Sequence, residues 1–81
     1  MKIYDFHGKS NISGNKIRQA RALRKVTQAD LAAKLQIEGV QLERNSISKI
    51  ESGDRFVADY ELLAISKVLR VGVEWLLNDE L

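Results

Sequence analysis

The stretch that decides the fold is RNSISKIESG, residues 44–53. Ile47 and Ile50 lie three residues apart, so on a helix they share one apolar edge. The polar residues around them would then point outward, and Gly53 suits the left-handed residue that ends a helix. Glu51 follows Ile47 by four residues and falls on the apolar face, where a lone carboxylate is costly to bury. The segment is therefore predicted to be a short helix with donors outside and one acid that needs a partner inside.

The composition limits the classes of protein to which the chain can belong. At 81 residues it is expected to form one domain with a small core. It contains no cysteine, which argues against a disulfide framework or a thiolate metal site and favours a reducing cytoplasm. No apolar run approaches the roughly 18 residues of a membrane span, and the N-terminus lacks the features of a signal peptide. His7, the only histidine, has no neighbouring ligands, so no metal or cofactor is expected.

Charge is distributed unevenly along the chain. The net charge is only +2, but residues 1–25 contain seven basic residues and one acid. That segment carries +6, which leaves −4 for the remainder. Such polarity suits a domain that turns one face toward a polyanion. The alternative is that these charges are ordinary solvated helix faces.

The chain begins with a segment that has no helical period. Residues 1–13 are expected to form an N-terminal arm that is flexible or loosely packed. A first helix is predicted from Gly14 to about Lys25, with Ser13 as its N-cap. Residues 14–81 are expected to form the folded domain.

The sharpest predicted helix start is Thr27-Gln28-Ala29-Asp30. Thr27 can cap the amides of the first turn, and Asp30 takes the acidic position of a capping box. This second helix is expected to bury Leu31 and Leu35 and to stop at Gly39. Two apolar residues of the following connector should pack onto the core: Val40 and Leu42.

Two more helices are predicted after residues 44–53. One runs roughly from Asp59 to Leu69, and its apolar face is formed by Leu62, Ile65 and Leu69. The last covers Val73 to Leu77 and contains Trp75, which is expected to lie in the core or at a dimer contact. The sequence thus predicts an all-α fold of five short helices.

Four pieces of the sequence, in this order, form a recognisable series. They are Ala20-Arg21, the helix that opens with Thr27-Gln28, the segment SISKIESG at 46–53 and the segment VGVEWLL at 71–77. Over residues 14–78 the chain resembles the Cro/C1-type (XRE) helix-turn-helix family of phage repressors and bacterial regulators. The resemblance implies a lambda-repressor-like domain that regulates transcription, as a repressor, and binds a palindromic operator as a homodimer.

The chain departs from the family pattern at three places. The connection between Leu35 and Ile47 is eleven residues long, which is longer than usual, so the second helix or its turn must be extended. Glu43 stands at the N-cap of the third helix, where Ser or Thr is more common. Arg70 stands where glycine or asparagine would usually end the fourth helix.

Residues near the start of the third helix are candidates for reading DNA bases. In helix-turn-helix proteins, this part of the recognition helix reaches base edges in the major groove. Arg can bond bidentately to guanine and Asn to adenine. The predicted base-contacting residues are Arg44, Asn45, Lys49 and Ser48. The alternative is an ordinary polar helix surface.

A second group is predicted to contact phosphates. The family carries a glutamine at the start of the second helix that bonds a DNA phosphate, and the matching residue here is Gln28. Free amides at a helix start also attract phosphate. The weaker candidates are Thr27, Lys16, Arg24, Lys25 and Arg55, which would fix register without specifying sequence.

Arg21 and Glu51 are predicted to have a structural role. Arg21 lies four residues after Ile17, so both charged residues intrude on apolar stripes. The resemblance implies that they form an ion pair that ties the first helix to the third.

The sequence supports other classes of function less well than DNA binding. An antitoxin-like or other protein-interaction module could use the same fold, with Leu76, Leu77 and Leu81 as contacts. An enzyme is the weakest class, because the sequence offers no nucleophile, base and orienting group together. Membrane-surface binding by the first helix would have few apolar anchors, so no membrane partner is expected.

Overall fold

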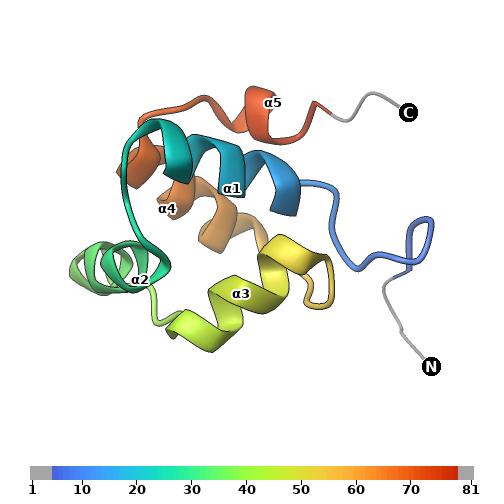
Figure 1. Ribbon diagram of the computed structural model, residues 1–81, viewed down its shortest axis with the longest axis horizontal. Helices are drawn as coiled ribbons and strands as arrows, with labels where there is room; N and C mark the ends of the chain where they lie inside the picture. The colour runs from blue at the N-terminus through green and yellow to red at the C-terminus, as the bar shows by residue number, and fades with distance from the viewer. Residues whose placement is uncertain (1–4, 79–81) are drawn as a thin grey trace.

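The five predicted helices are present in the computed structural model, which describes residues 5–78. They are α1 (Gly14–Leu23), α2 (Gln28–Ile37), α3 (Arg44–Ser52), α4 (Asp59–Leu69) and α5 (Val73–Leu76). Figure 1 shows α1 between α5 above and α3 below, with α4 behind α1 and α2 at one end of the molecule. Apart from one isolated bridge between Phe6 and Lys9, the described residues are helices and connections. Within residues 5–78, no helix is both long and apolar enough to cross a membrane.

The core is built from the apolar stripes of all five helices. α1 packs against α3, α4 and α5, while α2 packs against α3 and α4. Burying one large aliphatic side chain contributes about 1.5–3 kcal/mol, so the helices are stabilised mainly by these contacts and not by their own length. The fully buried large side chains are Ile17, Leu31, Leu35, Ile47, Ile50, Ile65, Leu69 and Leu76.

The predicted capping box at the start of α2 is formed. The N–H of Asp30 donates to Thr27 Oγ1 at 3.0 Å, and the N–H of Thr27 donates to the Asp30 carboxylate at 3.2 Å. The hydrogen bonds from the Thr27 backbone and then from its side chain lower the pKa of Asp30 below its ordinary value. The N–H groups of Thr27 and Asp30 thus gain acceptors that the helix itself does not supply.

The long connection before α3 is accommodated outside the helices. α2 ends at Ile37 and α3 begins at Arg44, so residues 38–43 form the connector. Gly39 turns the chain with φ of +84°, which glycine adopts without steric cost. Leu42 is buried and Val40 packs against the core, as predicted. These two apolar anchors hold the connector against the body.

Two helix ends differ slightly from the predicted positions. α1 ends at Leu23, and the chain turns at Lys25 with φ of +56°, so the predicted end at Lys25 was two residues late. α5 ends at Leu76, one residue before Leu77. The end of α4 is as predicted, although Arg70 adopts the left-handed conformation with φ of +55°.

Residues 9–11, within the predicted N-terminal arm of residues 1–13, contact the end of α3. Residues 1–4 lie outside the described residues. The N–H of Ser10 donates to the Gly53 carbonyl at 2.7 Å. The stem of Lys9 lies over Gly53, within 3.3 Å of where a Cβ would be. The segment is thus attached to α3 at the residue that ends it.

Asn11 also connects this segment to the rest of the domain. Its Nδ2 donates to the carbonyls of Ile50 at 2.9 Å and Arg55 at 2.7 Å. Its Oδ1 accepts from the N–H of Gly14 at 2.7 Å. Ser13 occupies the predicted N-cap position of α1, but its side chain forms no capping hydrogen bond, and Asn11 supplies the acceptor instead. A side-chain amide carries both donors and an acceptor, so one residue serves two helix ends.

Candidate nucleic-acid interface

α3 separates apolar and polar residues onto different faces. Ile47 and Ile50 are buried against the body, and the side chain of Glu51 is only 3% exposed. The helix runs from Arg44 to Ser52, and its C-cap residue Gly53 has a φ of +86°. The four predicted base-contacting residues all lie on the exposed part of this helix: Arg44, Asn45, Ser48 and Lys49. The structure thus leaves them accessible to an external partner.

Glu51 meets Arg21 in a two-point ion pair. Arg21 Nε donates to Glu51 Oε2 at 2.8 Å, and Arg21 Nη2 donates to Oε1 at 3.0 Å. The hydrogen bond to Glu51 raises the pKa of Arg21, assisted by the opposite charge and opposed by partial burial. A third guanidinium nitrogen, Nη1, donates to the Val26 carbonyl at 3.0 Å. The pair joins α1 to α3 and supplies the buried acid with its partner.

Gln28 and Arg18 extend this network. Gln28 Nε2 donates to Glu51 Oε1 at 3.1 Å, so the glutamine that the family resemblance assigns to a phosphate is also bonded inside the protein. A side-chain amide has two N–H groups, and the second remains for another acceptor. Arg18 Nε lies 3.9 Å from the same oxygen. Arg18 was missed in the sequence, although its position three residues before Arg21 places both on one helix face.

Three of the predicted phosphate-binding cations have partners within the protein. Lys16 Nζ lies 4.5 Å from the centre of the Trp75 ring, so this cation is directed at α5. Arg24 donates to the carbonyls of Leu69 at 2.8 Å and Arg70 at 2.9 Å, at the end of α4.

Arg55 is the third of these cations. Its Nη1 lies 3.0 Å from Glu61 Oε1, and its guanidinium also stacks over Phe56. Lys25, by contrast, is exposed in the turn immediately before α2. Of the four cations, Lys25 is the one whose position most favours a phosphate contact.

Glu61 is a second buried acid that sequence reasoning missed. It is 5% exposed and accepts hydrogen bonds from Arg55 and from the N–H of Ala58 at 3.0 Å. Ala58 has no side-chain acceptor of its own, so the glutamate supplies the polar partner at the start of α4. Its signal in the sequence was the same as that of Glu51: it lies four residues before Ile65, on the apolar stripe.

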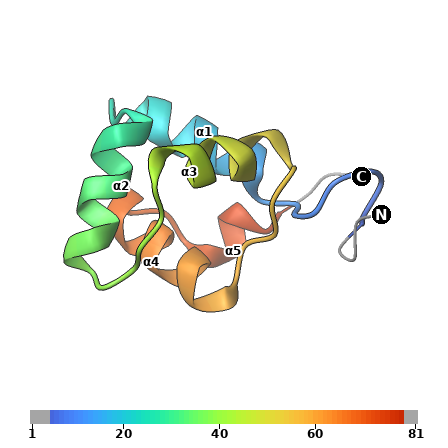
Figure 2. The same ribbon diagram turned by 90° about the horizontal axis from the view of Figure 1, so that it is seen from below.

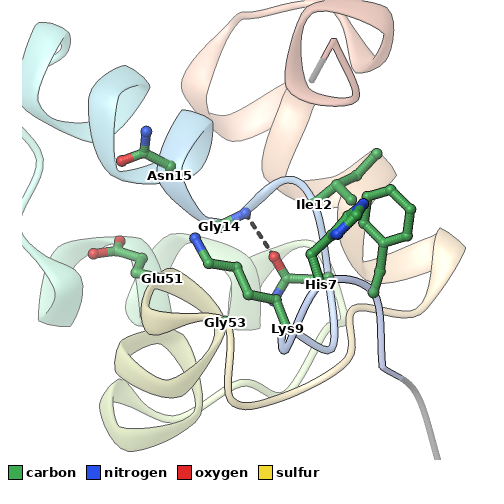
Figure 3. A pocket seen from close by; sticks show the side chains of 9 residues that line it. His7, Lys9, Ile12, Gly14, Asn15, Glu51 and Gly53 are labelled. Carbon is green, nitrogen blue, oxygen red and sulfur yellow. Dashed lines mark hydrogen bonds between the residues drawn. The ribbon is translucent and has the colours of Figure 1, made fainter. Parts of the chain in front are cut away.

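A small cavity lies between the N-terminal segment, α1 and α3 (Figure 3). Its volume is about 220 Å³. Figure 3 shows the Glu51 carboxylate turned away from Lys9 and His7. Among the described residues, no group of three or more histidine, cysteine or acidic side chains is placed to hold a metal ion. The cavity therefore brings together no set of residues with a recognisable catalytic or metal-binding arrangement.

The fold and the exposed α3 define a helix-turn-helix domain, in which α2 and α3 form the helix pair. The sequence model of the helix-turn-helix family matches residues 17–76, and the chain belongs to this family. The predicted resemblance to the Cro/C1-type (XRE) members is confirmed.

A solved structure shares the fold over nearly its whole length. It is the crystal structure of the P22 c2 repressor protein in complex with a synthetic operator, with 27% sequence identity and a TM-score of 0.71. The match covers 86% of this chain and 98% of the repressor chain. A comparison with curated proteins finds no match.

Proposed function

We propose that this protein is a sequence-specific DNA-binding transcription regulator, a repressor, that reads the major groove with α3. The observation that carries the proposal is the exposed polar face of α3 in a helix-turn-helix domain. The P22 c2 repressor, which has a similar fold, was crystallised with a synthetic operator. Its DNA partner would place this protein in the cytoplasm.

Base recognition is assigned to the first turns of α3. Arg44 would bond bidentately to guanine and Asn45 to adenine, each contributing about 1–3 kcal/mol of discrimination against the wrong base. Lys49 lies about one turn further along the helix, and Ser48 can donate to a base or a phosphate. All four are exposed, so binding would require no unfolding of the helix.

Phosphate contacts are assigned to the start of α2. The free amides of its first turn and the second N–H of Gln28 would donate hydrogen bonds to a phosphate near this helix end. Lys25 adds a positive charge in the preceding turn. Lys16, Arg24 and Arg55 are assigned to the body of the domain because of their internal partners.

The Glu51 network supports recognition by holding α3 in a fixed orientation. Arg21 from α1 and Gln28 from α2 both bond to Glu51 on α3. The base-reading helix is therefore positioned before DNA arrives, which lowers the ordering cost of binding.

Selection from a random duplex library tests this proposal. The wild-type protein is expected to enrich one motif made of two half-sites related by two-fold symmetry. The matched control is the Arg44→Ala/Asn45→Ala variant, whose substitutions lie on the exposed face, and it should retain the fold while enriching no motif. A wild-type protein that enriches nothing would contradict sequence-specific binding.

A further inference from the structure

α4 has one face that no other part of residues 5–78 covers. Its opposite face packs against α1, α2 and α5. The uncovered face contains, in chain order, an acid, two large side chains and a base: Asp59, Tyr60, Leu63 and Lys67. Tyr60 is 64% exposed and Leu63 is 48% exposed. They lie three residues apart, so their side chains are neighbours on the helix surface.

The two charges on this face are placed symmetrically about Leu63. Each lies four residues from Leu63, which is about 6 Å along the helix axis on either side. Asp59 and Lys67 are therefore too far apart to pair with each other. Among residues 5–78, the ion pairs involve neither of them. Both side chains are exposed, and neither is paired with an opposite charge in the described part of the chain.

This order of residues is complementary to itself in only one orientation. Two parallel copies of α4 would bring Asp59 against Asp59 and Lys67 against Lys67. Two antiparallel copies would bring Asp59 of each copy against Lys67 of the other, with Leu63 against Leu63 at the centre. A closed dimer with two-fold symmetry uses the same patch on both subunits and requires this kind of self-complementarity.

We infer that a second copy of this chain binds to the face of α4 formed by Asp59, Tyr60, Leu63 and Lys67, with the two α4 helices antiparallel. Figure 2 views the domain from the α3 side, with α4 along the lower edge of the outline. The two copies can be related by a two-fold axis that lies beyond that edge and runs parallel to the line of sight. In that arrangement, α3 of both copies faces the same side. The inference deepens the proposed function and rests on it for the role of the dimer. That role is to present two recognition helices to one duplex.

The apolar part of this interface is small, so the free dimer should be weak. A standard stable interface buries about 800 Å² per partner, more than two side chains supply. We expect the free protein to dimerise between about 10 μM and 1 mM. On DNA, two adjacent half-sites would raise the effective concentration of the second copy.

Charge reversal tests the pairing directly by sedimentation velocity of the purified protein without DNA. Asp59→Lys and Lys67→Glu should each be monomeric where wild type is dimeric, because each places like charges together. An equimolar mixture of the two variants should regain the dimer, because their mixed pair restores both opposite-charge contacts. Leu63→Glu should be monomeric, and the matched control Leu23→Glu on α1 should dimerise like wild type. Thermal melting of each variant checks that it is folded.

Three results would overturn the inference: a wild-type protein that is monomeric at about 1 mM, a dimer that survives Leu63→Glu, or folded single variants that remain monomeric when mixed. The outcome is separate from the test of the proposed function. A monomeric protein that still enriches a DNA motif contradicts only the α4 interface. A protein that dimerises through α4 but enriches nothing contradicts only the proposed function.

Discussion

The carboxylate of Glu51 accepts hydrogen bonds from α1 and α2, so one residue determines how two helices meet α3. Replacing Glu51 by alanine would leave the Arg21 guanidinium partly buried without its acid. Breaking a buried ion pair in this way costs about 3–5 kcal/mol, a large part of the 5–15 kcal/mol typical of a small domain. We expect Glu51→Ala to be unfolded or to melt far below wild type.

Urea unfolding measures this effect as a change in the free energy of unfolding. Glu38→Ala is the matched control, because Glu38 is exposed at the end of α2 and its loss should change stability by less than about 0.5 kcal/mol. Equal unfolding free energies for Glu51→Ala and wild type would show that the pair does not hold the domain together.

Arg44 and Lys25 should affect DNA binding in different ways. Arg44→Ala is expected to lose about 1–3 kcal/mol of discrimination at one base pair of the selected site. Lys25→Ala should weaken binding to all sequences alike and reduce the salt dependence, because a phosphate contact carries no base information. Competition binding with duplexes that differ at single positions measures both the loss of base discrimination and the general loss of affinity. If Arg44→Ala weakened every duplex equally, its role would be a backbone contact.

Individual residues show why the sequence predicted part of this site and missed the rest. Glu51 and Arg21 were identifiable because a charge on an apolar stripe needs a partner, and the family resemblance supplied the pairing. Asn11 gave no comparable signal. Its partners are backbone groups of Ile50 and Arg55, far along the chain, and a backbone group has no sequence identity.

Among the elements, helix starts were predicted better than helix ends. The start of α2 depends on Thr27 and Asp30, which lie within one turn, so the local sequence was enough to predict it. The start of α1 depends on Asn11 in a segment that has no helical pattern. The end of α1 is completed by a left-handed Lys25 rather than a glycine, and sequence patterns give little warning of that conformation.

The capping box of α2 should make stability depend on pH. The pKa of Asp30 is lowered in the folded state, so the ionised acid stabilises the fold above its unfolded pKa of about 3.9. This contribution is lost as the pH falls through the lowered folded-state pKa. We expect the stability difference between wild type and Asp30→Asn to be largest near about pH 6 and to shrink toward about pH 2. Urea unfolding across this range measures it, and a constant difference would contradict a role for the ionised form.

For the molecule as a whole, the basic first third of the sequence overstated the charge available to DNA. Of the seven basic residues before Val26, Arg21 is paired with Glu51, Arg24 bonds the end of α4 and Lys16 stacks on Trp75. These groups stabilise the domain itself. The charge count indicated the class of partner, but packing decides which cations face it.

Binding should depend on the distance between the two half-sites of the operator. A dimer presents two copies of α3 to one face of the duplex, which requires half-sites about one helical turn, or 10–10.5 base pairs, apart. Inserting about 5 base pairs would turn the second half-site to the opposite face, so we expect wild-type affinity to fall to that of one half-site. Lys67→Glu, which should block the α4 interface, is expected to bind the original and the lengthened operators equally. Gel-shift titration of the duplexes measures this, and a wild-type affinity unchanged by the insertion would show that the two copies bind independently.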